Sequence, residues 1–256
     1  MKLAKRHACN SSARGVFITG TDTGVGKTLV ASALVMHLVQ RGIDVGVMKP
    51  IETGYLRGTK ARSDGMRLRK AAGTDDPMAE VCPYVFRLSV APFSAARAEG
   101  TIVQIARIIR AFRGLSQKHA LMVAEGVGGV YAPITQSINV LDLIHRMKSA
   151  TVVVGRSGLG GINHALLTLH ALRRRNIPIV ALVLNQRQPL RTKIARMQEQ
   201  STVSLLRMLA GVPVIGPLPY STSMNRNWDR NLVRLAGTAP ITKLAGLILR
   251  FGRGTQ

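Results

Sequence analysis

Short apolar runs that alternate with segments of helical spacing constrain the fold of this chain most. The runs consist mainly of Val, Ile, Leu, Ala and Met, and several close on glycine or asparagine. A strand that is apolar on both faces is buried on both faces, as a parallel strand is when helices cover its sheet. The pattern therefore predicts an α/β fold with a doubly wound, mostly parallel sheet and helices on both faces. The six predicted strands are 15–19, 44–48, 121–124, 150–154, 179–184 and 212–218.

The first strand leads directly into Gly-Thr-Asp-Thr-Gly-Val-Gly-Lys-Thr, residues 20–28, and then into a helical pattern. A glycine-rich turn between a strand and a helix lets successive backbone N–H groups surround phosphate oxygens. Lys27 would reach the β- and γ-phosphates, and the Thr28 hydroxyl would bind Mg²⁺. The strict pattern places glycine six residues before the lysine, where Thr21 stands, with Gly20 one residue earlier. The segment predicts a nucleotide-binding P-loop.

The stretch from residue 52 to residue 100 fits the alternating pattern poorly, because it is rich in glycine, proline and charge. Residues 64–72 alone show a basic helical pattern, so we interpret the stretch as active-site loops plus one helix. Residues 15–256 are then predicted to form a single P-loop α/β domain. Residues 1–14 are basic and have no apolar segment, which predicts a disordered leader rather than a secretory signal.

Two further strand ends carry charged residues beside glycine. Lys49 follows the second strand in Lys-Pro-Ile-Glu-Thr-Gly, and Glu125 follows the third in Glu-Gly-Val-Gly-Gly. Because ligands of open α/β sheets bind at the carboxyl ends of the strands, Lys49 should point into the crevice of the P-loop. Glu125 suits Mg²⁺ held against a nucleotide. Asp64 is either a second carboxylate for this ion or a helix cap, and the sequence leaves both readings open.

A fourth strand-to-helix turn, residues 155–164, contains four glycines before Ile-Asn-His. A helix that begins there could receive a carboxylate on its free N–H groups. His164 is more often a hydrogen-bonded residue at a helix start than a general base. The amide of Asn185, at the end of another strand, either reads a purine edge or is simply a polar strand end.

These motifs, in this order, resemble those of the dethiobiotin synthetase family, and the resemblance runs from about residue 15 to residue 220. It implies a cytoplasmic enzyme that needs ATP and Mg²⁺. Such enzymes join 7,8-diaminopelargonate and CO₂ through a carbamate and a carbamic-phosphate intermediate, forming C–N bonds, and close the ring of dethiobiotin for biotin synthesis. The segments that carry the resemblance are 20–28, 49–54, Ser63-Asp64, 125–129, 160–168, Asn185 and 216–220.

The resemblance also assigns roles residue by residue. Lys49 and Lys27 would be catalytic, stabilising charge on the carbamate and the γ-phosphoryl group. Mg²⁺ would lie between Thr28, Asp64 and Glu125. The residues implied to contact ATP are Gly24, Val25, Gly26, Lys27, Thr28, Glu125, Gly126, Val127, Gly128, Asn185 and Pro219.

Three further positions are implied to bind the diamine substrate. Thr53 would touch the diamine or its carbamate. Gly161 and Asn163 would bind the substrate carboxylate from the helix start of a partner subunit. The resemblance therefore implies a homodimer with active sites at the interface.

Charge raises an alternative from another class. The chain has 36 Lys and Arg against 12 Asp and Glu, a net charge of +24, and such a chain attracts polyanions. A ParA/MinD-like ATPase that binds DNA or membrane would use this charge, but Asp22 stands where those proteins carry a signature lysine. Aromatic residues are only 4%, which leaves little for stacking on bases. We expect weak, salt-sensitive polyanion binding, without a specific nucleic acid or membrane partner.

Overall fold

The central sheet of the computed structural model is parallel throughout and has the strand order β2-β5-β1-β6-β7-β8. The structure describes residues 15–55, 63–224 and 226–252, so the predicted leader, 1–14, lies outside the described residues. All six predicted strands are present, and the doubly wound α/β prediction is confirmed. Their observed bounds are β1 Gly15–Gly20, β2 Val45–Met48, β5 Leu121–Gly129, β6 Ala150–Arg156, β7 Ile179–Asn185 and β8 Val214–Leu218.

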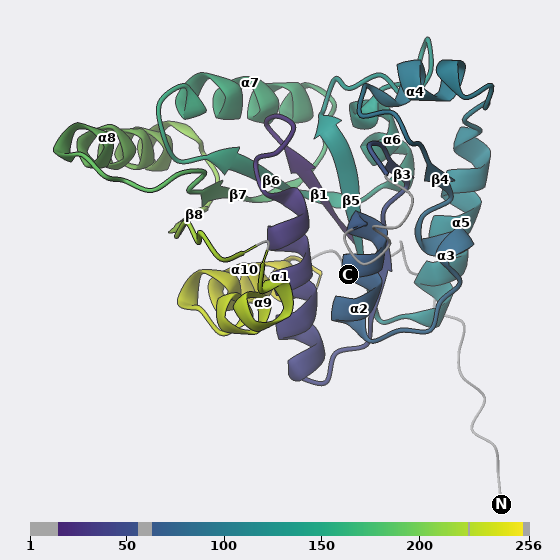
Figure 1. Ribbon diagram of the computed structural model, residues 1–256, viewed down its shortest axis with the longest axis horizontal. Helices are drawn as coiled ribbons and strands as arrows, with labels where there is room; N and C mark the ends of the chain where they lie inside the picture. Colours follow the sequence, from purple (N-terminus) through teal and green to yellow (C-terminus); the bar gives the residue numbers. More distant parts are fainter. Residues whose placement is uncertain (1–14, 56–62, 225, 253–256) are drawn as a thin grey trace, which may run out of the picture.

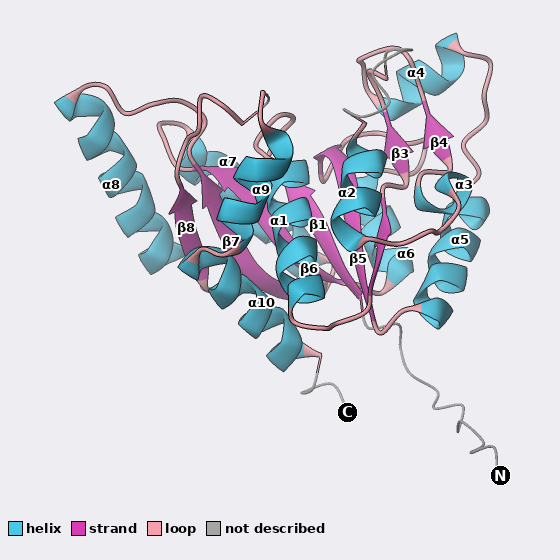
Figure 2. Ribbon diagram, turned by 60° about the horizontal axis from the view of Figure 1, so that its bottom comes forward, coloured by secondary structure: helices cyan, strands magenta, loops and turns pink. Residues whose placement is uncertain are grey.

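Helices cover both faces of the sheet (Figures 1 and 2). Successive residues of one strand belong to two different apolar clusters: Phe17 packs on one face, and Val16 and Ile18 pack on the other. This alternation explains why the strands are apolar along their whole length. One face holds α1 (Lys27–Gln40), α2 (Asp64–Ala72), α9 (Trp228–Ala236) and α10 (Ala239–Phe251), and the other holds α4 (Pro92–Ala98), α5 (Ile105–Lys118), α6 (Val140–Met147), α7 (Gly161–Arg174) and α8 (Lys193–Leu209).

The stretch 52–100 contains more structure than the sequence predicts. The expected helix, α2, occupies the predicted residues, but α4 and a one-turn helix, α3 (Met78–Val81), are also present. Two short strands, β3 (Ile51–Glu52) and β4 (Tyr84–Val85), pair in a separate parallel sheet. Strands of two residues are too short to show a period of two, which is why the pattern gave no sign of them. The small sheet ties the segment after Lys49 to residues 84–86.

Strand β5 extends five residues beyond its predicted end and carries the Glu125 loop along the P-loop. Its register with β1 shifts between Ile18 and Gly20, and Gly20 then pairs with Gly129. Gly126 allows this path, since a Cβ there would lie 2.8 Å from the ring of Phe17. The glycines that the sequence suggested for phosphate approach thus also bring β5 close to β1.

The C-terminal helix α10 is rich in apolar residues. Its apolar residues Ile241, Leu244 and Ile248 are buried in the cluster that also contains Leu34 of α1. Among the described residues no single helix is long and apolar enough to cross a membrane. Helices α9 and α10 reach that length and composition only as a pair, across a bend of 64°.

His119 joins three segments at the end of the sheet where β2 begins. It follows α5, and its Nδ1 lies 2.7 Å from Asp44 while its Nε2 lies 2.8 Å from Asp76. Burial disfavours the charged imidazole, but hydrogen bonding to the two carboxylates outweighs burial and raises the pKa of His119 above its usual value. Lys118 also faces Asp76, at 3.8 Å. The doubly bonded imidazolium stabilises the fold as long as it stays protonated.

We therefore expect His119→Gln to destabilise the protein by about 1–2 kcal/mol at pH 6, because a charged hydrogen-bond donor to two carboxylates is lost. A raised pKa in the folded state means that this stabilisation is complete below the unfolded pKa of His119 and disappears as the pH rises through the folded one. Urea denaturation of both proteins at pH 6 and pH 9 measures it. An equal difference at both pH values would contradict the assignment.

Candidate active site

The P-loop passes from β1 into α1, and α1 begins at Lys27. Gly24 and Gly26 have φ angles of 70° and 105°, which other residues adopt only with strain. A Cβ on Gly26 would also lie 2.2 Å from Nδ2 of Asn185. At Gly20 a Cβ would lie 2.8 Å from the Asp22 carbonyl and 2.9 Å from Nζ of Lys27. The strict P-loop pattern expects a glycine at residue 21. In this loop the close contacts require the glycine one residue earlier, at Gly20.

Lys27 lies across the P-loop with its ammonium group held by backbone. Nζ donates to the carbonyl of Asp22 at 2.9 Å and to that of Gly128, in the β5 loop, at 2.8 Å. Burial, followed by repulsion from Lys49, lowers the pKa of Lys27 to about 8. A cation at the start of a helix, held by two carbonyls, is suited to bind a phosphate.

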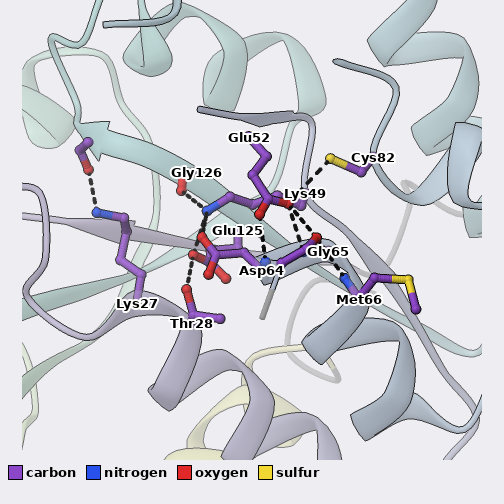
Figure 3. Close-up of polar contacts among 12 residues, drawn as sticks. Lys27, Thr28, Lys49, Glu52, Asp64, Gly65, Met66, Cys82, Glu125 and Gly126 are labelled. Atoms are coloured by element: carbon purple, nitrogen blue, oxygen red, sulfur yellow. Dashed lines mark hydrogen bonds and ion pairs between the residues drawn. The ribbon is translucent and has the colours of Figure 1, made fainter. Parts of the chain in front are cut away.

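Lys49 lies at the centre of the site and is 3% exposed (Figure 3). Its Nζ is 2.6 Å from Oε1 of Glu125, 2.9 Å from Oδ2 of Asp64 and 3.1 Å from the carbonyl of Gly126. Burial opposes its charge, but the Glu125 and Asp64 carboxylates outweigh burial and raise the pKa of Lys49. The lysine is therefore a permanent cation at neutral pH, and it does point into the P-loop crevice as predicted.

Three oxygen-bearing side chains that the sequence assigned to Mg²⁺ come together here. Thr28 donates to Oε1 of Glu125 at 2.8 Å, and Asp64 reaches the same Lys49 ammonium. Glu125 is fully buried, and its second oxygen, Oε2, has no hydrogen-bond partner among the described residues. Burial, with Asp64 nearby, raises the pKa of Glu125. A hydroxyl, two carboxylates and one orphan oxygen fit Mg²⁺, which binds proteins through few carboxylates and keeps phosphate and water ligands.

Asp64 reaches this position because α2 begins there. The N-cap of α2 is Ser63, whose hydroxyl accepts the Met66 N–H, so the reading of Asp64 as the helix cap is wrong. The Lys49 ammonium, together with hydrogen bonding from Thr28, outweighs burial and lowers the pKa of Asp64. Glu52, to which the sequence analysis gave no role, accepts hydrogen bonds from the start of the helix. Like Asp64 and Glu125, Glu52 is one of only 12 acidic residues in the chain.

The predicted nucleoside residues lie at the ends of adjacent strands. Asn185 pairs with Leu218, so Pro219 follows directly at the neighbouring strand end. The Asn185 amide is buried and donates to the carbonyl of Val25 at 2.9 Å, while its Oδ1 accepts no hydrogen bond from the part of the chain that the structure describes. Val127 packs its side chain against the apolar cluster on the α5 side of the sheet, which leaves its backbone for ligand contact.

A cavity of about 360 Å³ opens beside the tip of the P-loop. It lies between the loops that follow β6 and β7, and Gly24, Val25 and Arg156 line it together with Gln186, the residue after Asn185. The cavity is thus bounded on one side by the P-loop.

The predicted substrate residues are spread more widely. Thr53 is half-buried and lies four residues after Lys49 on the same segment. Gly161 begins α7 and is buried, whereas Asn163 is exposed. Among the described residues, no hydrogen bond joins Gly161 or Asn163 to Lys27 or Lys49. His164 lies 3.3 Å from Arg156 through Nδ1, which favours the hydrogen-bonded histidine over the general base.

Arg156, at the end of β6, was also missed by the sequence analysis. Its guanidinium pairs with Asp22 at 3.1 Å, and Asp22 in turn accepts the Thr23 N–H at 2.7 Å. Asp22, which stands where ParA-like ATPases carry a signature lysine, thus forms an ion pair with Arg156 of the same chain. The two residues are 134 positions apart, and no local pattern indicated the pair.

Solved structures share this fold at low sequence identity. The MinC:MinD cell division protein complex of Aquifex aeolicus matches with a TM-score of 0.53 and 12% identity, over 93% of this chain and 95% of that chain. A ParA family ATPase from Chlorobium tepidum TLS matches with a TM-score of 0.51 and 14% identity, over 94% and 99%. Such identities show the fold alone.

Sequence comparison is more specific. A family described as an AAA domain matches residues 14–227. An ATP-dependent dethiobiotin synthetase of Anaeromyxobacter dehalogenans is 47% identical over 69% of this chain and 78% of its own length. The corresponding proteins of Thermodesulfovibrio yellowstonii and Nitrosopumilus maritimus are 40% and 31% identical, over 83% and 86% of this chain and 91% and 96% of their own lengths. The chain therefore belongs to the ATP-dependent dethiobiotin synthetase family.

Proposed function

We propose that this chain, an ATP-dependent C–N ligase by its family, converts 7,8-diaminopelargonate and CO₂ to dethiobiotin with the help of Mg²⁺. The observation that carries the proposal is the Lys49 ammonium, held between Glu125 and Asp64 next to the P-loop lysine. We infer that the reaction takes place in the cytoplasm. The one cysteine in the described residues, Cys82, is a buried free thiol, which suits a reducing compartment.

The proposed reaction has three bond-forming steps. One amine of the substrate adds to CO₂ and loses a proton, which gives a carbamate. A carbamate oxygen attacks the γ-phosphorus of ATP and ADP leaves, which gives a mixed carbamic-phosphoric anhydride. The second amine then attacks the carbamate carbon, phosphate leaves, and the ureido ring closes.

The two lysines act as fixed positive charges in this scheme. The pKa of Lys49 is raised, so Lys49 stays protonated and does not serve as a base; it stabilises the negative charge of the carbamate and of the transferring phosphoryl group. Lys27 holds the phosphates from the P-loop side. Thr28, Asp64 and Glu125 would hold Mg²⁺, which would supply positive charge against the phosphates. Thr53 lies on the Lys49 segment, where it would meet the diamine.

We also propose a homodimer in which α7 of one subunit completes the site of the other. Two features support it: the start of α7 at Gly161–Asn163, where Asn163 is exposed, and a set of exposed apolar side chains on α7, α8 and the loop before α7. Figure 1 shows α7 and α8 side by side at one end of the sheet. The exposed large apolar residues on these helices and the loop before α7 are Leu159, Leu167, Ile194, Met197, Met208 and Leu209.

The direct test is a coupled assay with purified protein, diaminopelargonate, bicarbonate, Mg²⁺ and ATP. Dethiobiotin and phosphate should appear in equal amounts, and both should require the diamine. ATP turnover that depends on DNA and ignores the diamine would contradict the proposal and favour the partitioning-ATPase alternative.

Lys49→Gln should lower the rate of dethiobiotin formation by about 10²–10³-fold, as expected when one preorganised charge is removed from a transition state. Circular dichroism should show an intact fold. Lys70→Gln is the matched control, because Lys70 is exposed on α2 and pairs only with Asp229 on the surface. Activity of the Lys49 variant within threefold of the control would refute its catalytic role.

Leu167→Glu should weaken the dimer and reduce activity together, because it places charge in the proposed interface. Ile102→Glu serves as control, since Ile102 is 82% exposed and precedes α5, away from α7 and α8. Sedimentation velocity at micromolar concentration gives the oligomeric state. A Leu167 variant that is as dimeric and as active as the Ile102 variant would exclude this interface.

A further inference from the structure

Glu52 is a buried carboxylate that accepts hydrogen bonds from the N-cap and the first two residues of α2. Oε1 accepts the Asp64 N–H at 2.8 Å, and Oε2 accepts the Ser63 hydroxyl at 2.9 Å and the Gly65 N–H at 3.2 Å (Figure 3). The thiol of Cys82 lies 3.9 Å from Oε2. The side chain is 6% exposed, and among the described residues no Lys, Arg or His forms an ion pair with it.

Glu52 lies outside α2 and accepts hydrogen bonds from the N–H groups at the start of that helix. The first N–H groups of a helix have no partner within it, and the positive end of its dipole favours an anion. In α2 Ser63 satisfies the Met66 N–H, and Glu52 satisfies the two N–H groups that remain at Asp64 and Gly65. A neutral side chain at residue 52 would lack the negative charge that the positive end of the helix dipole favours.

Asp64 is therefore held from two sides by one short segment. Its backbone N–H donates to Glu52, and its carboxylate pairs with Lys49, which lies three residues before Glu52 in the chain. The segment itself is fixed: the Lys49 N–H donates to Val81 at 2.7 Å, and the Phe86 N–H donates to the Glu52 carbonyl at 2.8 Å. The position of the Asp64 carboxylate thus depends on Glu52.

We propose that Glu52 is a positioning residue that places the Asp64 carboxylate for Mg²⁺. This rests on the proposed function, in which Asp64 holds the metal. Glu52 does not touch the metal or the nucleotide in this proposal; it acts through the start of α2. A residue with a purely structural role would lower the stability of the protein without changing how much the metal strengthens nucleotide binding.

The test measures that contribution without turnover. The dissociation constant of a fluorescent ATP analogue is determined in Mg²⁺ and in EDTA. The constant in EDTA divided by the constant in Mg²⁺ is the ratio that gives the contribution of the metal. Glu52→Gln keeps the size of the side chain but replaces one acceptor oxygen with an N–H₂ donor. It should lower the ratio by about tenfold, the usual effect of losing a residue that orients a metal ligand. Binding in EDTA should stay unchanged.

Three further variants complete the design. Asp64→Asn should lower the ratio at least as much, and the Glu52→Gln/Asp64→Asn double variant should be no worse than Asp64→Asn alone, because Glu52 acts through Asp64. Asp142→Asn is the matched control: Asp142 accepts the Asn139 N–H at the start of α6, outside the site. It should lower the melting temperature but not the ratio.

The outcomes separate the two proposals. If Asp64→Asn leaves the ratio unchanged, the metal role of Asp64 fails, and this inference fails with it. If Asp64→Asn lowers the ratio but Glu52→Gln does not, only the inference about Glu52 is overturned. Should Glu52→Gln fail to fold, Glu52→Asp replaces it, since it keeps the charge and shortens the reach by one methylene. An unchanged ratio in that variant, or additive effects in its double variant with Asp64→Asn, would also overturn the inference.

Discussion

One buried ammonium group holds the site together. Lys49 contacts two carboxylates, Glu125 and Asp64, that come from different elements and would repel each other without it. A buried ion pair stabilises a fold weakly or not at all, because both charges lose their hydration. The fully buried Glu125 and the 3% exposed Lys49 are therefore better explained by chemistry than by stability. The loops around them serve to keep these charges in place.

The backbone achieves this with parallel strand ends and glycines. Strands β2, β5 and β1 are neighbours in the sheet and end at one edge, so Lys49, Glu125 and the P-loop meet there although they are far apart in sequence. Gly20, Gly26 and Gly126 let the loops approach more closely than any side chain would permit. The same residues that open room for phosphate also allow the protein segments to pack together.

The sequence predicted those parts of the fold and site that rest on local pattern. Long apolar strands, the P-loop and the helix 64–72 each have a period or a motif, and the lysine and acid at strand ends follow from sheet topology. Parts that rest on contacts between distant segments were not predictable. Strands β3 and β4 are too short, and the Arg156–Asp22 and His119–Asp76 pairs join residues 134 and 43 positions apart. Glu52 was visible as a scarce acid, but only the structure shows that it faces the start of α2.

The distribution of the acidic residues gives the net charge of +24 a structural meaning. Four of the 12 acids, Glu52, Asp76, Glu125 and Glu199, are buried, and each accepts hydrogen bonds inside the protein. The carboxylates of this chain are thus partly withdrawn from solvent, while its cations remain largely outside. A molecule built in this way carries its excess of positive charge mainly on the outside. This positive charge would attract anionic small molecules to the protein. The rate at which they associate would fall as the ionic strength rises.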